Sequence, residues 1–244
     1  MQCIQAMNHG QISLKTDKSK TAHIKQCKIQ LQQHQQRLEQ CTLCPQMFGP
    51  AIHGLPVVSK VMLIGQAPGF KEVEVLRPFA WTAGKKLFSW FETLGVDETC
   101  FRKTVYMSAI CRCYPGKKNT GKKQQSNSGL LPKAHGDRVP DKNEIKQCSQ
   151  WLQSEINILK PALVILVGKL AISQFMPVKK LDEVIGKTHR IIINGHQCDA
   201  IPLPHPSGAS TWPVTEPGKT LLKQAMTHIK KHPAWIESTH RLQR

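Results

Sequence analysis

The stretch Val61–Gly69 constrains the fold more than any other part of the sequence. It begins with four consecutive apolar residues, and Gly65, Pro68 and Gly69 follow within the next five positions. An uninterrupted apolar run is typical of a parallel strand buried on both faces, and the glycines and proline indicate that it ends in a tight turn. Ligands of open α/β sheets bind beyond the carboxyl ends of such strands. The stretch therefore predicts either a binding site or a purely structural turn.

The periodicity of apolar residues in the rest of the chain favours an α/β protein. Strand-like and helix-like segments alternate, and Asn194-Gly195 is a favoured turn for a hairpin. We therefore expect a three-layer αβα sandwich with a short, mostly parallel central sheet. The predicted strands are 61–64, 104–111 and 162–167 with a hairpin at 191–203, and the predicted helices are 24–41, 82–94, 141–159 and 217–229.

A chain of 244 residues is long enough to bury one good core, so we expect a single domain at 23–236. Residues 1–22 are predicted to form a flexible basic tail, and 237–244 a C-terminal tail. Within the domain, residues 117–142 carry seven Lys and Arg against two Asp. This composition predicts a long loop that contacts phosphates, or a solvated insertion without a function.

The charge of the chain indicates a polyanionic partner. Lys and Arg total 34 against 16 Asp and Glu, a formal net charge of +18. Nucleic acid is favoured over a membrane surface, because no basic helix with a strong apolar face occurs. Residues 1–16 lack the apolar region of a secretory signal, and the longest apolar run, 162–167, is too short to span a membrane. We expect a monomeric, cytoplasmic protein that binds nucleic acid.

Cysteines form the first group of residues with distinctive chemistry. Nine cysteines in an intracellular protein do not indicate disulfides. Cys41 and Cys44 form a C-x-x-C, Cys113 ends a predicted strand, and Cys148 lies on the inner face of a predicted helix. Four such thiolates fit zinc or an iron–sulfur cluster, and spacing does not choose between these two or exclude ordinary thiols. Cys111 alternates with Cys113, so we expect it on the other face of the strand.

His205 is the second candidate for a chemical role. It lies between Pro204 and Pro206 just beyond a predicted strand. The prolines hold the backbone extended and aim the imidazole, which suits a ring that donates a hydrogen bond to a developing anion. The alternative is a structural or surface histidine in a loop. His34, on the helix 24–41, is predicted to be a surface residue.

Taken in order, these features resemble the motifs of the uracil-DNA glycosylase superfamily, and in particular its iron–sulfur branches, families 4 and 5. The resemblance covers residues 41–229. It implies a monofunctional DNA N-glycosylase that flips uracil out of DNA, hydrolyses the N-glycosidic bond and leaves an abasic site. It also implies a structural [4Fe–4S] cluster on Cys41, Cys44, Cys113 and Cys148. The motifs are Gly65-Gln66-Ala67-Pro68-Gly69, Arg77-Pro78-Phe79, Ala83-Gly84, Cys113-Tyr114-Pro115, Cys148 and His205-Pro206-Ser207.

The resemblance also implies roles for individual residues. Phe79 would stack on the flipped base, and the backbone at Gln66 and its neighbours would bind the polar edge of the base. His205 would stabilise the base anion at its carbonyl oxygen, so the catalytic residues are His205 and Gln66. The other implied residues are Gly65, Ala67, Pro68, Gly69, Ser108 and Ala109 for the substrate, and Ser207, Gly208, Ala209, Ser210 and Trp212 for DNA.

Several positions depart from the family pattern. Ala67 stands where the classical enzymes carry a water-activating aspartate, and Gln66 where family 4 carries glutamate. Glu72 and Glu74 remain as candidate water-positioning groups, or as solvated loop charges. Ala109 replaces the asparagine that reads uracil in family 4, so narrow uracil specificity is not expected and deaminated purines become plausible substrates.

These departures keep other hypotheses open. The first is an iron–sulfur nucleic-acid-binding protein of the same fold that has lost catalysis. The second is a zinc-stabilised nuclease or binding module. In addition, one relative carries in a basic insertion a histidine that bonds covalently to the abasic sugar. His135 lies in a comparable place, although the surrounding motif does not match residue for residue.

Overall fold

The structure is a computed structural model that describes residues 8–118, 136–208 and 210–240. Its centre is a five-stranded sheet with the strand order β2-β1-β3-β5-β4. All neighbouring strands are parallel except the β4–β5 hairpin. The predicted short and mostly parallel sheet is therefore confirmed. The strands are β1 (Val61–Gly65), β2 (Tyr106–Ala109), β3 (Leu163–Val167), β4 (His189–Ile193) and β5 (His196–Leu203).

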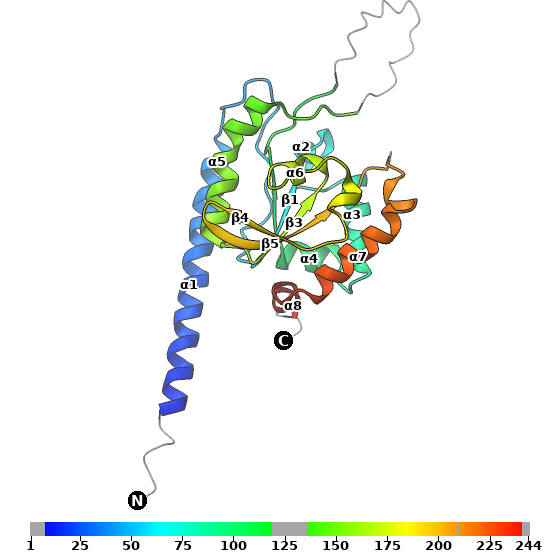
Figure 1. Ribbon diagram of the computed structural model, residues 1–244. Coiled ribbons are helices and arrows are strands. Elements are labelled where there is room, and N and C mark those ends of the chain that lie inside the picture. The colour runs from blue at the N-terminus through cyan, green and yellow to red at the C-terminus, as the bar shows by residue number, and fades with distance from the viewer. Residues whose placement is uncertain (1–7, 119–135, 209, 241–244) are drawn as a thin grey trace, which may run out of the picture.

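Helices cover both faces of this sheet, which gives the expected three layers (Figure 1). On one face, α1 (Asn8–Glu39) lies alongside α5 (Lys142–Leu159). The other face is covered by α3 (Thr82–Glu92), α4 (Glu98–Thr104), α7 (Gly218–Lys231) and α8 (Pro233–His240). The short elements are α2 (Phe70–Val75), α6 (Lys169–Ser173), and the 3-10 turns η1 (Leu181–Glu183) and η2 (Trp212–Val214).

Local sequence explains the ends of α5 well. The Asp141 carboxylate accepts hydrogen bonds from the N–H groups of Asn143 and Glu144, and the Glu144 side chain accepts one from the Asp141 N–H, which completes a capping box. At the other end, Lys160 adopts a left-handed conformation just before Pro161. The apolar stripe between these ends is buried, as the sequence predicts.

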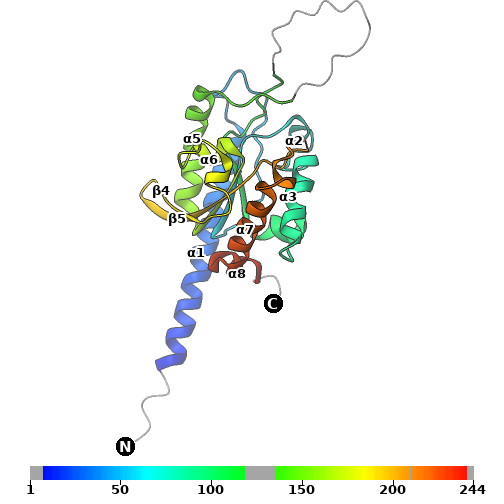
Figure 2. The same ribbon diagram turned by 45° about the vertical axis from the view of Figure 1, so that its right-hand side comes forward.

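The ends of the chain differ from the prediction. Residues 8–22 belong to α1, so the flexible tail predicted for 1–22 is wrong over that range, while residues 1–7 lie outside the described residues. The helix was missed because its first half extends away from the domain and needs no apolar stripe (Figure 2). Residues 237–240, predicted as a tail, are the last turn of α8, and 241–244 lie outside the described residues.

Two short helices also differ from the prediction. α2 occupies part of a predicted loop, and α4 ends at Thr104, the residue expected to begin the second strand.

None of the helices that the structure describes is long and apolar enough to cross a membrane. Because β1, β2, β3 and β5 are parallel, their carboxyl ends meet at one edge of the sheet.

Candidate functional site

A pocket of about 480 Å³ opens at this carboxyl edge of the sheet. Its size lies within the range typical of small-molecule sites. The chain segments that meet there are the turn after β1, the end of β2, the segment before α3 and the segment after β5. The pocket brings together all the predicted catalytic and substrate-binding residues, which are Gly65, Gln66, Ala67, Pro68, Gly69, Phe79, Ser108, Ala109 and His205.

Phe79 lies directly against the end of β1. A Cβ atom at Gly65 would be 2.8 Å from Cζ of the Phe79 ring, so only glycine leaves room for the ring. The loop that carries this ring is fixed by Arg102 on α4, which donates hydrogen bonds to the carbonyls of Pro78 (2.9 Å) and Phe79 (3.1 Å). Glu98 orients Arg102 through a 2.8 Å ion pair. Sequence reasoning missed Arg102, because no motif contains it and the two carbonyls that it holds are more than 20 residues away.

Gly84 fixes the same loop from the side of α3. A Cβ atom there would lie 1.8 Å from the carbonyl oxygen of Phe79, which is backbone and must move with the chain. We expect Gly84→Ala to destabilise the protein by about 2–3 kcal/mol, the range of costly overpacking, and to lower its thermal midpoint by about 5–10 °C. Circular dichroism measures this shift. Gly136→Ala is the control, because no atom of the described residues lies within 4 Å of its Cβ position, and an equal shift in both variants would contradict the contact.

His205 follows β5 and borders the pocket. Its ring is open to solvent on one side and packs on the other against Gly168, where a Cβ atom would be 3.2 Å from His205 Cδ2. Burial lowers the pKa of the imidazole, so the ring is neutral at neutral pH. Gly168 has φ of +88° and is a second residue that sequence reasoning missed, since only the folded chain brings it to His205.

The two predicted candidates for water positioning differ in their environments. Glu72 borders the pocket, and its Oε2 accepts a hydrogen bond from the Gly69 N–H at 2.6 Å. Burial raises the pKa of Glu72. Glu74 is exposed, pairs with Lys71 at 2.7 Å and does not border the pocket. A further carboxylate, Asp137, borders the pocket and was not predicted.

A second cavity, of about 230 Å³, is lined by all four predicted metal ligands, Cys41, Cys44, Cys113 and Cys148. Burial raises the pKa of Cys44 to about 11 and that of Cys113 to about 12. Cys111 was expected on the opposite face of its strand, which is wrong, because its thiol hydrogen-bonds Cys148 and lowers the pKa of Cys148 to about 7. In the part of the chain that the structure describes, no three His, Cys, Asp or Glu side chains converge closely enough for a single metal ion.

Two residues with buried N–H donors that are unpartnered among the described residues border the same cavity. Arg112 is 1% exposed, and its Nε and Nη1 have no hydrogen-bond partner among the described residues. The indole Nε1 of Trp151 is likewise without a partner there. Buried donors are almost always satisfied in folded proteins, so an acceptor in this cavity would complete them.

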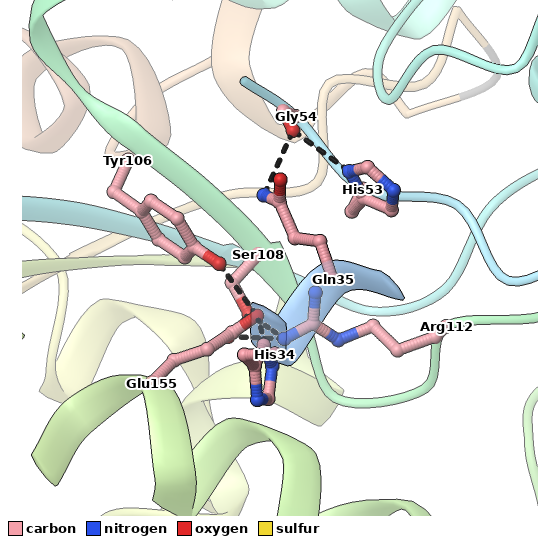
Figure 3. A network of polar contacts seen from close by, with 8 residues as sticks. All are labelled: His34, Gln35, His53, Gly54, Tyr106, Ser108, Arg112 and Glu155. Atoms are coloured by element: carbon pink, nitrogen blue, oxygen red, sulfur yellow. Dashed lines mark hydrogen bonds and ion pairs between the residues drawn. The ribbon is translucent and has the colours of Figure 1, made fainter. Parts of the chain in front are cut away.

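Arg112 also belongs to a buried polar network centred on Glu155 of α5 (Figure 3). Glu155 accepts hydrogen bonds from Tyr106 (2.7 Å), Ser108 (2.9 Å) and Arg112, and its Oε1 lies 3.2 Å from Nε2 of His34. Burial alone would raise the pKa of Glu155, but Arg112 and these hydrogen bonds hold it below its usual value. The prediction that His34 is a surface residue is wrong, because α1 packs against α5 at this point.

The residues expected to contact DNA lie after β5. Ser207 borders the pocket. Trp212 begins η2, and its indole N–H donates to Asp182 at 2.8 Å, so its ring is anchored to the protein. Gly208 and Ser210 lie between these two, and Ala209 lies outside the described residues.

Comparison with known proteins assigns the family. The family model of the uracil DNA glycosylase superfamily matches residues 53–230. A Type-4 uracil-DNA glycosylase of Pyrobaculum aerophilum is 28% identical over 63% of this chain and 69% of the relative. A Type-4 uracil-DNA glycosylase of Saccharolobus solfataricus is 26% identical over 71% of both chains. The matched segment contains the whole sheet, His205 and every residue that lines the pocket except Ile52, and the chain belongs to the uracil DNA glycosylase superfamily.

Proposed function

We propose that the chain is a monomeric DNA glycosylase that hydrolyses the N-glycosidic bond of uracil flipped out of DNA and leaves an abasic site. The observation that carries this proposal is the single pocket shared by the turn after β1, Phe79 and His205. Other deaminated bases are included as substrates, because Ala109 offers no side-chain amide to read uracil. The net charge of +18 suits a protein that acts on DNA, and the proposed location is the nucleoid.

The pocket residues divide the reaction between them. The ring of Phe79, which packs against Gly65, supplies an apolar face on which the flipped base stacks. Backbone N–H and C=O groups at Gln66 and its neighbours bind the polar edge of the base. As the C1′–N bond lengthens, charge develops on the departing base, and the neutral ring of His205 donates a hydrogen bond to its carbonyl oxygen. A donor fixed before the reaction stabilises this anion without reorganisation.

We also propose that Cys41, Cys44, Cys113 and Cys148 hold a [4Fe–4S] cluster. Four thiols around a cavity provide the donor set that such a cluster requires. The unsatisfied N–H groups of Arg112 and Trp151 fit the same assignment, because cluster sulfurs accept hydrogen bonds. When bound, the cluster would stabilise the fold by joining the segments after α1 and β2 to α5, and it supplies no chemical step.

Cys113→Ser is expected to yield colourless protein with a lower thermal midpoint and poor solubility, since removing one of four ligands releases the metal. Visible absorbance and iron content measure this loss. Cys100→Ser is the control, because Cys100 is half-buried on α4 and does not border the cavity. A Cys113→Ser variant that stays brown and stable would show that the ligand set is wrong, and colourless wild-type protein with stoichiometric zinc would overturn the cluster.

The proposed activity is tested by base release. Purified cluster-loaded protein is incubated with end-labelled oligonucleotides that contain uracil, hypoxanthine or xanthine, in single strands and in mismatched duplexes. Alkali then cleaves the abasic sites. Release of uracil that leaves the strand intact before alkali treatment is expected. If loaded protein binds DNA but releases no base, the altered residues Gln66 and Ala67 have removed catalysis, and the binding-protein hypothesis replaces the enzyme.

A further inference from the structure

The turn after β1 supplies no carboxylate to the pocket, since Gln66 and Ala67 stand at the two positions where relatives of the classical and family 4 type carry one. Hydrolysis still needs a water molecule held near C1′ and a group that takes its proton. In the part of the chain that the structure describes, the carboxylates bordering the pocket are Glu72 and Asp137. The two are distinguished by what each oxygen already contacts.

Glu72 is committed to the backbone. Its Oε2 accepts the Gly69 N–H at 2.6 Å, and backbone hydrogen bonds from its own residue and from Ala80 also reach the carboxylate. The side chain is 9% exposed and closes the capping box of α2. A carboxylate held in this way fixes the turn at Gly69, and it has little freedom to receive a proton from water.

Asp137 has one oxygen held and one oxygen open. Oδ1 accepts hydrogen bonds from the Tyr114 hydroxyl (3.0 Å) and from Lys117 Nζ (2.8 Å). Lys117 and Asp137 also face each other in an isolated antiparallel bridge, so the backbone is fixed at this residue as well. Oδ2 receives no hydrogen bond from the described residues. It points toward the turn after β1, where a Cβ atom at Gly69 would be 3.2 Å away.

We propose that Asp137 is the carboxylate that positions and deprotonates the attacking water, with Oδ2 as the atom that accepts the proton. This step rests on the proposed glycosylase activity. The water oxygen bonds to C1′ while the C1′–N bond breaks, and the bonding pair leaves with the base as its anion. One water proton passes to Asp137, and the base anion takes its proton from solvent. Lys117 and Tyr114 keep the carboxylate aimed, because both hold Oδ1 and leave Oδ2 free.

The test is single-turnover release of uracil by the full chain. Asp137→Asn keeps the shape and an oxygen acceptor for Tyr114 and Lys117, but it cannot take a proton. We expect release to slow by at least about 10-fold, the lower end of general-base effects, because a good leaving group carries part of the barrier. Affinity for the uracil oligonucleotide, visible absorbance and thermal midpoint should stay at wild-type values. Glu74→Gln is the matched control, the same change from carboxylate to amide at a residue that does not border the pocket.

A second variant distinguishes loss of the proton acceptor from a change in structure. Asp137→Ala opens space at the same place, and formate added to this variant is expected to restore at least part of the rate by acting as the missing carboxylate. If wild-type protein releases base and Asp137→Asn does so at an unchanged rate, the proposal for Asp137 is overturned and the glycosylase stands. If formate leaves Asp137→Ala as slow as before, Asp137 acts only through structure and the proposal is likewise overturned. An inactive wild type overturns the activity itself.

Discussion

His205→Ala is expected to slow uracil release by about 10²–10³-fold, the loss typical of removing one donor to a developing anion. His205 borders the pocket just beyond the end of β5, and its ring packs against Gly168. Because burial lowers the pKa of the imidazole, the ring is already neutral at neutral pH and remains an N–H donor as the pH rises. Its contribution to the rate should therefore not fall between pH 7 and 8.5. Single-turnover measurements of the wild type and of His205→Ala across this pH range test the size of the loss and whether it changes with pH.

The matched control for this variant is His228→Ala. His228 is exposed on α7 and does not border the pocket. Loss of uracil affinity with an unchanged rate of bond cleavage would assign His205 to binding alone. An unchanged rate and affinity would contradict the proposed site, because no other imidazole borders the pocket within the described residues.

Much of the site could be predicted because it depends on two local rules. Parallel strands bring their carboxyl ends to one edge, so the turn at Gly65–Gly69 and the segment of Ser108 and Ala109 had to meet. The hairpin 191–203, with its Asn194-Gly195 turn, delivers His205 to the same edge. The C-x-x-C and two further cysteines likewise converge on one cavity. Sequence patterns a few residues long were therefore enough to predict where these residues lie.

The features that were missed depend on partners far apart in the sequence. Arg102 holds the loop of Phe79 from another helix, and Asp137 enters the pocket only because Tyr114 and Lys117 fix it there. Cys111 reaches Cys148 because the chain after β2 does not continue the alternation of a strand. The periodicity of apolar residues predicts each helix or strand separately, whereas these contacts join residues of different elements.

His34 and Glu155 were also missed because their partners are far away in the sequence. Their network has the largest expected effect on the stability of the protein. The sequence predicts His34 as a surface residue and gives no reason to place Glu155 in the core. In the folded protein they are 1% and 0% exposed and share one network with Arg112. This network connects the two sites, since Ser108 borders the pocket and Arg112 borders the cysteine cavity.

Glu155→Ala is expected to destabilise the protein by about 3–5 kcal/mol, the cost of leaving a buried charge without its partner. Arg112 would retain its charge at 1% exposure, and the hydroxyl groups of Tyr106 and Ser108 would lose their acceptor. For a chain of this length, such a loss lowers the thermal midpoint by about 6–20 °C. Circular dichroism of cluster-loaded protein measures the shift, and iron content shows whether the displaced Arg112 also weakens metal retention.

The control for Glu155 is an ion pair at the surface. Glu74→Ala removes the carboxylate that Lys71 contacts at 2.7 Å, and both groups keep water around them, so the expected cost is below about 1 kcal/mol. Equal shifts in the two variants would contradict the role of burial. Glu155→Gln distinguishes charge from hydrogen bonding, because it keeps an acceptor for Tyr106 but cannot neutralise Arg112. If the charge dominates, Glu155→Gln should be nearly as unstable as Glu155→Ala.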